Sequence, residues 1–182
     1  FVMAFWLYRW VKAQKSEHER VEQIGRIIEQ GANAFLKREY SILARFSGIM
    51  AILILLFIPT PIWKGSIQNI IMAISFLAGA VFSALAGKVG IQVATIANRK
   101  TAVAAQRGIR PAFLTGFRGG AVMGMAVVGI SLLGVTIVYL LTEDATTILA
   151  FSFGASSLAL FAKAGGGIFT KTADISADLV GK

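Results

Sequence analysis

Four charged side chains at helical spacing lie at the end of the chain: Lys171, Asp174, Asp178 and Lys182. If the segment is a helix, their offsets of 3, 7 and 11 residues place them in one stripe about 60° wide, because successive residues rotate by about 100°. Two carboxylates four residues apart repel each other, which costs a helix a few tenths of a kcal/mol. The pair therefore needs a positive charge beside it.

Two interpretations of this stripe compete. In the first, Lys171 pairs with Asp174 and Lys182 with Asp178 as a surface ladder, the usual role of charges at this spacing. In the second, the carboxylates bind Mg²⁺, which prefers oxygen ligands, and a lysine ammonium attracts the same anion. Three preceding glycines, 165–167, would let backbone or anion approach closely. The residues alone leave both interpretations open.

The composition predicts a membrane protein. Of the 182 residues, 56% are hydrophobic and only 15% are charged, and the mean hydropathy is +0.72. Soluble domains rarely combine these values, so we expect an all-α, polytopic transmembrane helical bundle. The absence of cysteine excludes disulfides and a thiol nucleophile. The net charge of +9 comes without a nucleic-acid-binding motif, so no nucleic acid is expected as a partner.

Hydropathy predicts four full spans and the tail of a preceding one, with a lipid bilayer as their environment. The tail is 1–11, and the spans are 42–58, 67–97, 119–141 and 145–162. We expect 1–182 to be a single membrane-domain fragment of a longer protein. The stripe follows the last span directly, in the segment 163–182. Ionisable groups at a membrane boundary are costly and often functional, which favours the second interpretation.

Small residues recur every four positions in two spans, a pattern typical of close helix packing. In the third span they are Ser75, Gly79, Ser83 and Gly87, and around the start of the fourth they are Gly116, Gly120 and Gly124.

The distribution of cations predicts the topology. With these spans, Lys64 is the only one of the 18 Lys and Arg residues on the far side, which leaves 17 on the near side. Because cytosolic loops carry an excess of Lys and Arg, the near side and the segment 163–182 are expected to face the cytosol.

The segment GGGIFTKTADISADLVGK, 165–182, resembles the active-site signature of the membrane-bound, ion-translocating inorganic pyrophosphatases. Weaker likenesses to the same family are GANAFLKREY at 31–40, ATIANRKTAVAA at 94–105 and FRGGAVMGMAVVGISLLG at 117–134. The resemblance covers essentially the whole chain, but only the front part of a much longer family sequence.

This resemblance implies Mg²⁺-dependent hydrolysis of pyrophosphate coupled to translocation of H⁺ or Na⁺, with K⁺ as a further candidate cofactor. Lys171 and Lys182 would bind the substrate, and Asp174 and Asp178 would hold the metal. No residue of this chain is assigned as catalytic, and the chain alone is expected to be inactive because two carboxylates cannot hold the several Mg²⁺ ions such a site needs.

Lys163 occupies the position, eight residues before the substrate lysine, where most members of that family carry an arginine at the mouth of the ion channel. The resemblance therefore makes Lys163 the candidate ion-channel gate. It further implies a homodimer in the multi-pass inner membrane of a prokaryotic cell. The alternative from another class is a secondary transporter that binds an anionic solute at a helix end, where glycine-rich breaks are common.

Overall fold

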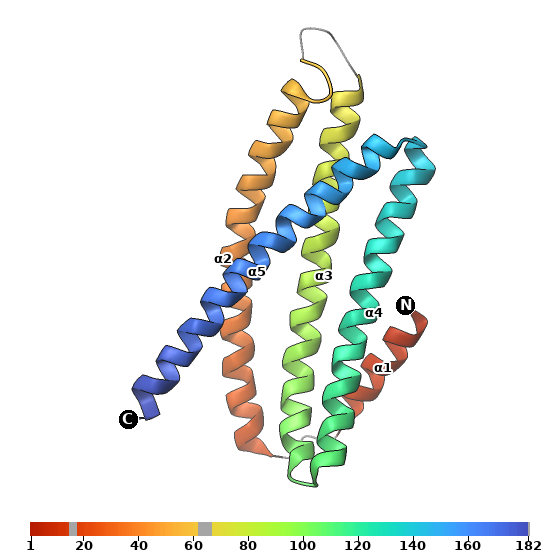
Figure 1. The fold of residues 1–182 in the computed structure, drawn as a ribbon. Coiled ribbons are helices and arrows are strands. Elements are labelled where there is room, and N and C mark those ends of the chain that lie inside the picture. Colours follow the sequence, from red (N-terminus) through yellow and green to blue (C-terminus); the bar gives the residue numbers. More distant parts are fainter. Residues whose placement is uncertain (15–17, 62–66, 182) are drawn as a thin grey trace. The chain divides into compact units, whose positions relative to one another are not determined.

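The structure is a computed structural model that describes residues 1–14, 18–61 and 67–181. Within these ranges the regular structure consists of five α-helices and contains no strand (Figure 1). The helices are α1 (Val2–Ala13), α2 (Glu19–Phe57), α3 (Ile67–Ala105), α4 (Ile109–Thr142) and α5 (Ala145–Gly181). The predicted all-α class is confirmed.

Helices α2 to α5 are each long and apolar enough to cross a membrane. Large apolar side chains such as Ile49, Leu132 and Leu160 are more than 60% exposed on them. Exposed apolar surface of this extent is typical of a protein whose surroundings are lipid. The predicted polytopic transmembrane fold is therefore confirmed.

These four helices are longer than a bilayer requires. They contain 34 to 39 residues, or about 50–58 Å at 1.5 Å per residue, whereas the hydrocarbon core is about 30 Å thick. Three predicted spans lie inside one of these helices each, and the span 42–58 extends one residue beyond the end of α2. The polar stretches next to the spans therefore continue the same helices. In α2, the acidic Glu19 and Glu22 of the first turn favour helix initiation. The span limits and the single membrane domain stay predictions.

The contacts group into two units, which we describe separately. Unit 1 comprises Phe1–Leu36 and Leu85–Leu133. Its core joins Leu7 of α1, Val93 of α3 and Val122 of α4. At the edge of this core, the Arg118 guanidinium lies over the Trp10 ring, 3.9 Å from its centroid.

The glycines of α4 show which helix face packs within unit 1. A Cβ on Gly119 would collide with the Cβ of Ala97 on α3, and one on Gly116 would lie 3.6 Å from Thr101 Oγ1. Gly120 and Gly124 have open space around them within the described chain. The closest approach therefore involves Gly119, which the four-residue pattern did not include.

Arg99 of α3 forms two ion pairs in unit 1. Its guanidinium lies 3.5 Å from a Glu22 carboxylate oxygen and 3.3 Å from one of Glu29. These glutamates are seven residues apart on α2 and so share a face. Between them lies Gly25, whose missing side chain leaves room for the aliphatic part of Arg99. The buried Gly25 is thus a steric condition for both ion pairs.

Unit 2 comprises Lys37–Ala84 and Gly134–Lys182. Helices α3 and α5 approach most closely here, because a Cβ on Gly79 would meet the Phe151 carbonyl and a Cβ on Gly154 would meet the Phe76 carbonyl. The predicted packing role of the stripe in α3 is therefore confirmed at Gly79. Around this contact, a cluster of buried side chains joins α2, α3 and α5: Ala51, Ile54, Met72, Ala73, Phe76 and Ala150.

Polar side chains connect α2 and α3 in the same unit. Asn69, only 2% exposed, donates from Nδ2 to the carbonyls of Leu55 (3.0 Å) and Thr60 (2.6 Å). Tyr40 donates its hydroxyl proton to the carbonyl of Ala84 at 2.7 Å. Because buried polar groups are costly unless they are hydrogen-bonded, these bonds favour one register of α2 against α3.

Gly25→Ala is expected to destabilise the protein. The added Cβ would overlap Cγ and Cδ of Arg99, and displacing that side chain would leave Glu22 and Glu29 without it. We expect a loss of about 1–3 kcal/mol, measured as a lower Tm in detergent. Gly31→Ala is the matched control on the same helix, because Gly31 has open space around it and alanine favours a helix. Equal effects of the two substitutions would contradict this role of Gly25.

Candidate functional site

The N-terminus of α5, the helix that carries the charged stripe, is capped by Asp144. Oδ2 of Asp144 accepts hydrogen bonds from the Thr147 backbone N–H (2.9 Å) and hydroxyl (2.7 Å), and Oδ1 accepts one from the Thr146 N–H (3.2 Å). Oδ2 also accepts a bond from Gln68 Nε2 of α3 at 2.8 Å. One carboxylate therefore caps α5 and connects its start to α3.

These bonds favour the ionised form of the carboxyl group. The Thr147 hydroxyl and then the Thr146 N–H hold the pKa of Asp144 below its ordinary value. Asp144 lies in the short connection between α4 and α5, outside the predicted spans.

The middle of α5 is held by aromatic and aliphatic contacts in unit 2. Leu158 is buried with Leu43 and Ala80, and the ring centroid of Phe161 lies 4.7 Å from that of Phe46 on α2. Beyond this point the burial ends, since every described residue from Gly167 to Gly181 is exposed. The stripe is thus presented by the exposed part of a helix whose first half is packed in unit 2.

Helix α5 continues through the three glycines without interruption (Figure 1). A Cβ added to Gly166 or Gly167 would meet no atom within 4 Å outside its own helix and chain neighbours. The alternative of a secondary transporter was based on a helix break at these glycines, and α5 has no break between Ala145 and Gly181. Without side chains at these positions, the surface of the helix before the stripe is open to close approach.

The hydroxyl groups around the stripe are bonded within the helix. Thr170, Thr172 and Ser176 each donate to the carbonyl four residues earlier, at 2.9, 2.9 and 2.8 Å. Such bonds occupy the hydroxyl proton with the backbone. The groups of the stripe that are left for an external ligand are therefore the charged ones.

Lys171, Asp174 and Asp178 all lie on α5 and are exposed, and the helical spacing predicted for them is confirmed. Among the described residues, no ion pair joins Lys171 to Asp174. The first pair of the surface ladder is thus not formed. Lys182 lies outside the described residues. Lys163 is exposed on the same helix, about 12 Å before Lys171 along the axis.

The oxygen donors of the stripe fit Mg²⁺ as part of a shared ligand set. Asp174 and Asp178 are one helical turn apart, about 5–6 Å between Cβ atoms, and both are exposed. The described residues contain no group of three or more His, Cys, Asp or Glu side chains that could enclose a metal. An ion bound here would therefore complete its coordination with water and ligand oxygens, as Mg²⁺ commonly does.

A family model described as inorganic H⁺ pyrophosphatase matches residues 1–182. The chain belongs to this family, as the resemblance of its 165–182 segment predicted. Its curated relatives include a K⁺-insensitive pyrophosphate-energized proton pump of Methanosarcina mazei, 45% identical over 91% of this chain and 23% of the relative. A putative K⁺-stimulated pyrophosphate-energized sodium pump of Clostridium tetani is 42% identical over 100% of this chain and 26% of the relative.

The chain spans about a quarter of the length of the curated relatives that it matches. The four apolar helices and the membership in this family together identify it as an integral membrane protein.

Two polar groups that position the helices were not predicted from the sequence. Asp144 could have been found, because an aspartate directly before an apolar helical stretch is a typical N-cap. The pairing of Arg99 with Glu22 and Glu29 has no comparable signal, since 77 and 70 residues separate the partners in the sequence.

Asp144→Ala is expected to lower the Tm at neutral pH, because α5 loses its cap and the Gln68 nitrogen loses an acceptor. The native pKa is lowered, so the stabilisation is present above the ordinary carboxyl pKa and disappears as the pH falls through the native value. The difference in Tm between wild type and variant should therefore shrink in acid. The adjacent, exposed Glu143 provides the control Glu143→Gln, and a pH-independent difference for Asp144→Ala would contradict a role of its charge.

Proposed function

We propose that this chain is part of a pump that hydrolyses pyrophosphate with Mg²⁺ and translocates H⁺ or Na⁺ across the membrane. The observation that carries this proposal is the exposed stripe of Lys171, Asp174 and Asp178 on an uninterrupted helix that leaves an apolar span. The family match over the whole chain and the names of its relatives support it. These names divide between K⁺-insensitive proton pumps and K⁺-stimulated sodium pumps, so K⁺ belongs to the proposal as a second cofactor.

In this proposal Lys171 and Lys182 bind pyrophosphate. An ammonium is a compact charge with three donors, which suits the oxygens of a polyanion. Lys171 has no carboxylate partner within the described residues, so it would not have to leave an ion pair to bind substrate. Its position directly after the open glycine segment lets an extended anion approach the helix.

Asp174 and Asp178 hold Mg²⁺ in the same proposal. Bound Mg²⁺ neutralises phosphate charge and polarises the phosphoryl group. The chain's own contribution is to present two carboxylates on one helix face beside Lys171. A cation between these carboxylates and the anion would relieve their mutual repulsion. No catalytic base is assigned to these residues.

Lys163 is the proposed ion-channel gate. Because α5 is continuous from Lys163 to Asp178, the substrate-binding and gate positions belong to one rigid element and would shift together along its axis. A charge that is exposed at the base of the site and close to the predicted span can repel or release a cation at the channel mouth.

The proposed orientation places the stripe in the cytosol, in a homodimer in the inner membrane of a prokaryotic cell. The excess of Lys and Arg on the near side of the predicted spans supports this orientation. Pyrophosphate is a charged cytosolic solute, so its binding groups have to face that compartment.

Asp178→Asn in a full-length pump carrying this chain is expected to slow pyrophosphate hydrolysis about a hundredfold or more, since loss of one electrostatic contact to a transition state has effects of this size. It should also raise the Mg²⁺ concentration for half-maximal activity. Lys171→Arg should abolish activity as well, because a planar guanidinium does not replace a point charge. Phosphate release and ion uptake into vesicles are the measurements.

Ser176→Ala is the matched control, because the Ser176 hydroxyl is already bonded to the Thr172 carbonyl and the variant should keep normal turnover. If Asp178→Asn retained both normal turnover and normal Mg²⁺ dependence, the stripe would be a surface ladder and the proposed metal role would be wrong.

The orientation is tested with single cysteines introduced into a cysteine-free protein. The 182 residues of this chain contain no cysteine of their own. A membrane-impermeant maleimide should label Glu143→Cys from outside intact cells but Gln106→Cys only after the membrane is opened. Both positions are exposed, so access to the side chain does not differ between them. The reverse pattern would place the stripe outside the cytosol and contradict the proposal.

A further inference from the structure

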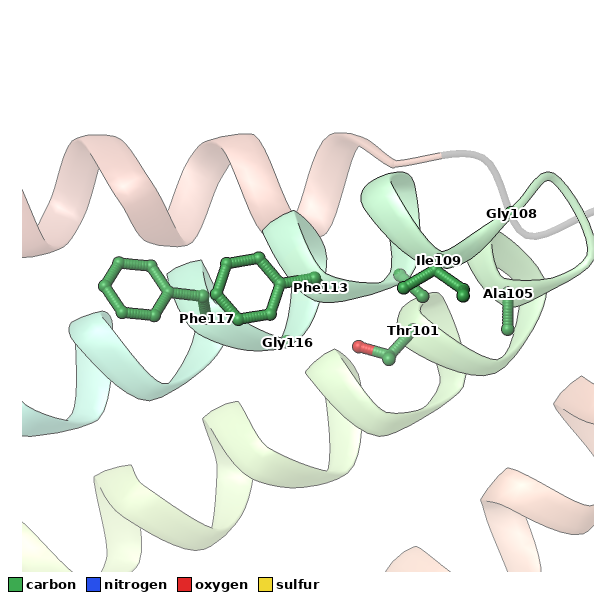
Figure 2. A pocket seen from close by; sticks show the side chains of 8 residues that line it. Thr101, Ala105, Gly108, Ile109, Phe113, Gly116 and Phe117 are labelled. Atoms are coloured by element: carbon green, nitrogen blue, oxygen red, sulfur yellow. The ribbon is translucent and has the colours of Figure 1, made fainter.

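An open apolar groove lies where α3 ends and α4 begins, within unit 1. It has a volume of about 540 Å³ and is lined by residues of both helices. Figure 2 shows the Phe113 and Phe117 side chains beside each other along α4, with Thr101 and Ala105 on the neighbouring turns of α3. The two phenyl rings are stacked with centroids 5.7 Å apart, and each phenylalanine is 64% exposed.

The groove continues into an exposed apolar edge. Ile109, 90% exposed, precedes the phenylalanines at four-residue spacing, so Ile109, Phe113 and Phe117 follow one face of α4. Such a face is unfavourable in water but suits the boundary between acyl chains and headgroups.

The α3–α4 segment that forms the groove carries only positive charges. The part of unit 1 between Leu85 and Leu133 contains six Lys and Arg residues and no Asp or Glu. Two of the six are engaged, Arg99 by the glutamates of α2 and Arg118 by Trp10. Arg107 and Arg110, which flank the groove residues Gly108 and Ile109, are exposed and have no carboxylate partner within the described chain.

The length of α4 places this groove near the headgroups. From its far end at Thr142, the helix reaches Phe113 after 29 residues, or about 44 Å. A bilayer including its headgroups is about 40–45 Å thick. With Thr142 at the far headgroup surface, the phenylalanines would fall within the near-side headgroup layer. The two arginines would then lie at its outer edge, where long side chains can reach phosphate oxygens.

We propose that this groove binds an anionic phospholipid of the near-side leaflet. Phe113, Phe117 and Ile109 would contact the glycerol and upper acyl region, and Arg107 and Arg110 would pair with the phosphate. The combination of an apolar face with unpaired cations beside it matches a molecule that has both an apolar body and a negative head, which a soluble anion does not have. This inference is independent of the proposed hydrolysis.

The test uses the purified full-length pump in neutral detergent, with phosphatidylglycerol and phosphatidylcholine as probes and native mass spectrometry to count bound lipids. The wild type should bind one phosphatidylglycerol per protomer more tightly than phosphatidylcholine. Arg107→Gln with Arg110→Gln should remove this preference, at roughly fivefold in affinity per arginine. The double variant Arg107→Lys with Arg110→Lys should retain this preference, because lysine keeps the positive charge. Its binding would also show that the connection between α3 and α4 tolerates substitution at these two positions.

Arg20→Gln with Arg26→Gln is the charge-matched control, because both arginines are exposed on α2 of the same unit. Phe117→Ser should weaken both lipids. The proposal is overturned if the control pair reduces phosphatidylglycerol binding as much as the groove pair, or if neither pair changes it. It is also overturned if millimolar inorganic phosphate displaces the lipid, which would indicate a site for a soluble anion.

Discussion

The contact between the backbones of α3 and α5 is the constraint on which the candidate site depends. Gly79 and Gly154 each face a carbonyl of the other helix, so neither position has room for a side chain. In a membrane, apolar side chains gain little by leaving lipid, and close packing between backbones takes the place of the hydrophobic effect as the force that joins helices. A larger residue at either position would separate the helices and shift the whole of α5.

This contact has a polar counterpart at the start of α5. Asp144 satisfies the first N–H groups of the helix and receives the Gln68 amide of α3. The helix is thereby fixed at its first turn and at its middle, whereas its second half is exposed. The packed first half fixes the position of the helix that carries the stripe. The exposed second half leaves the charges of the stripe available to a ligand and to other parts of the pump.

The two units use charge in opposite ways. In unit 1, Arg99 pairs with two glutamates, and its aliphatic part lies against Gly25. Its charge therefore helps to hold α3 against α2. In unit 2, Lys171, Asp174 and Asp178 are exposed, although two like charges on adjacent turns repel each other. The repulsion between Asp174 and Asp178 would be relieved if a bound metal ion neutralised their charge. Such a role agrees with the pyrophosphatase family to which the chain belongs.

Much of this protein could be predicted from the sequence. Long apolar stretches require helices in a membrane, because only intrahelical bonds satisfy the backbone there, and the spacing of Lys171, Asp174 and Asp178 places them on one face of any helix. The tertiary structure decided which glycines pack: Gly119 approaches Ala97, while Gly120 and Gly124 have open space. It also decided that Arg99 pairs with Glu22 and Glu29 and that α5 passes through its three glycines unbroken. The physical reason is that periodicity defines the faces of a helix, whereas the face that meets a neighbour depends on where the neighbouring helix lies.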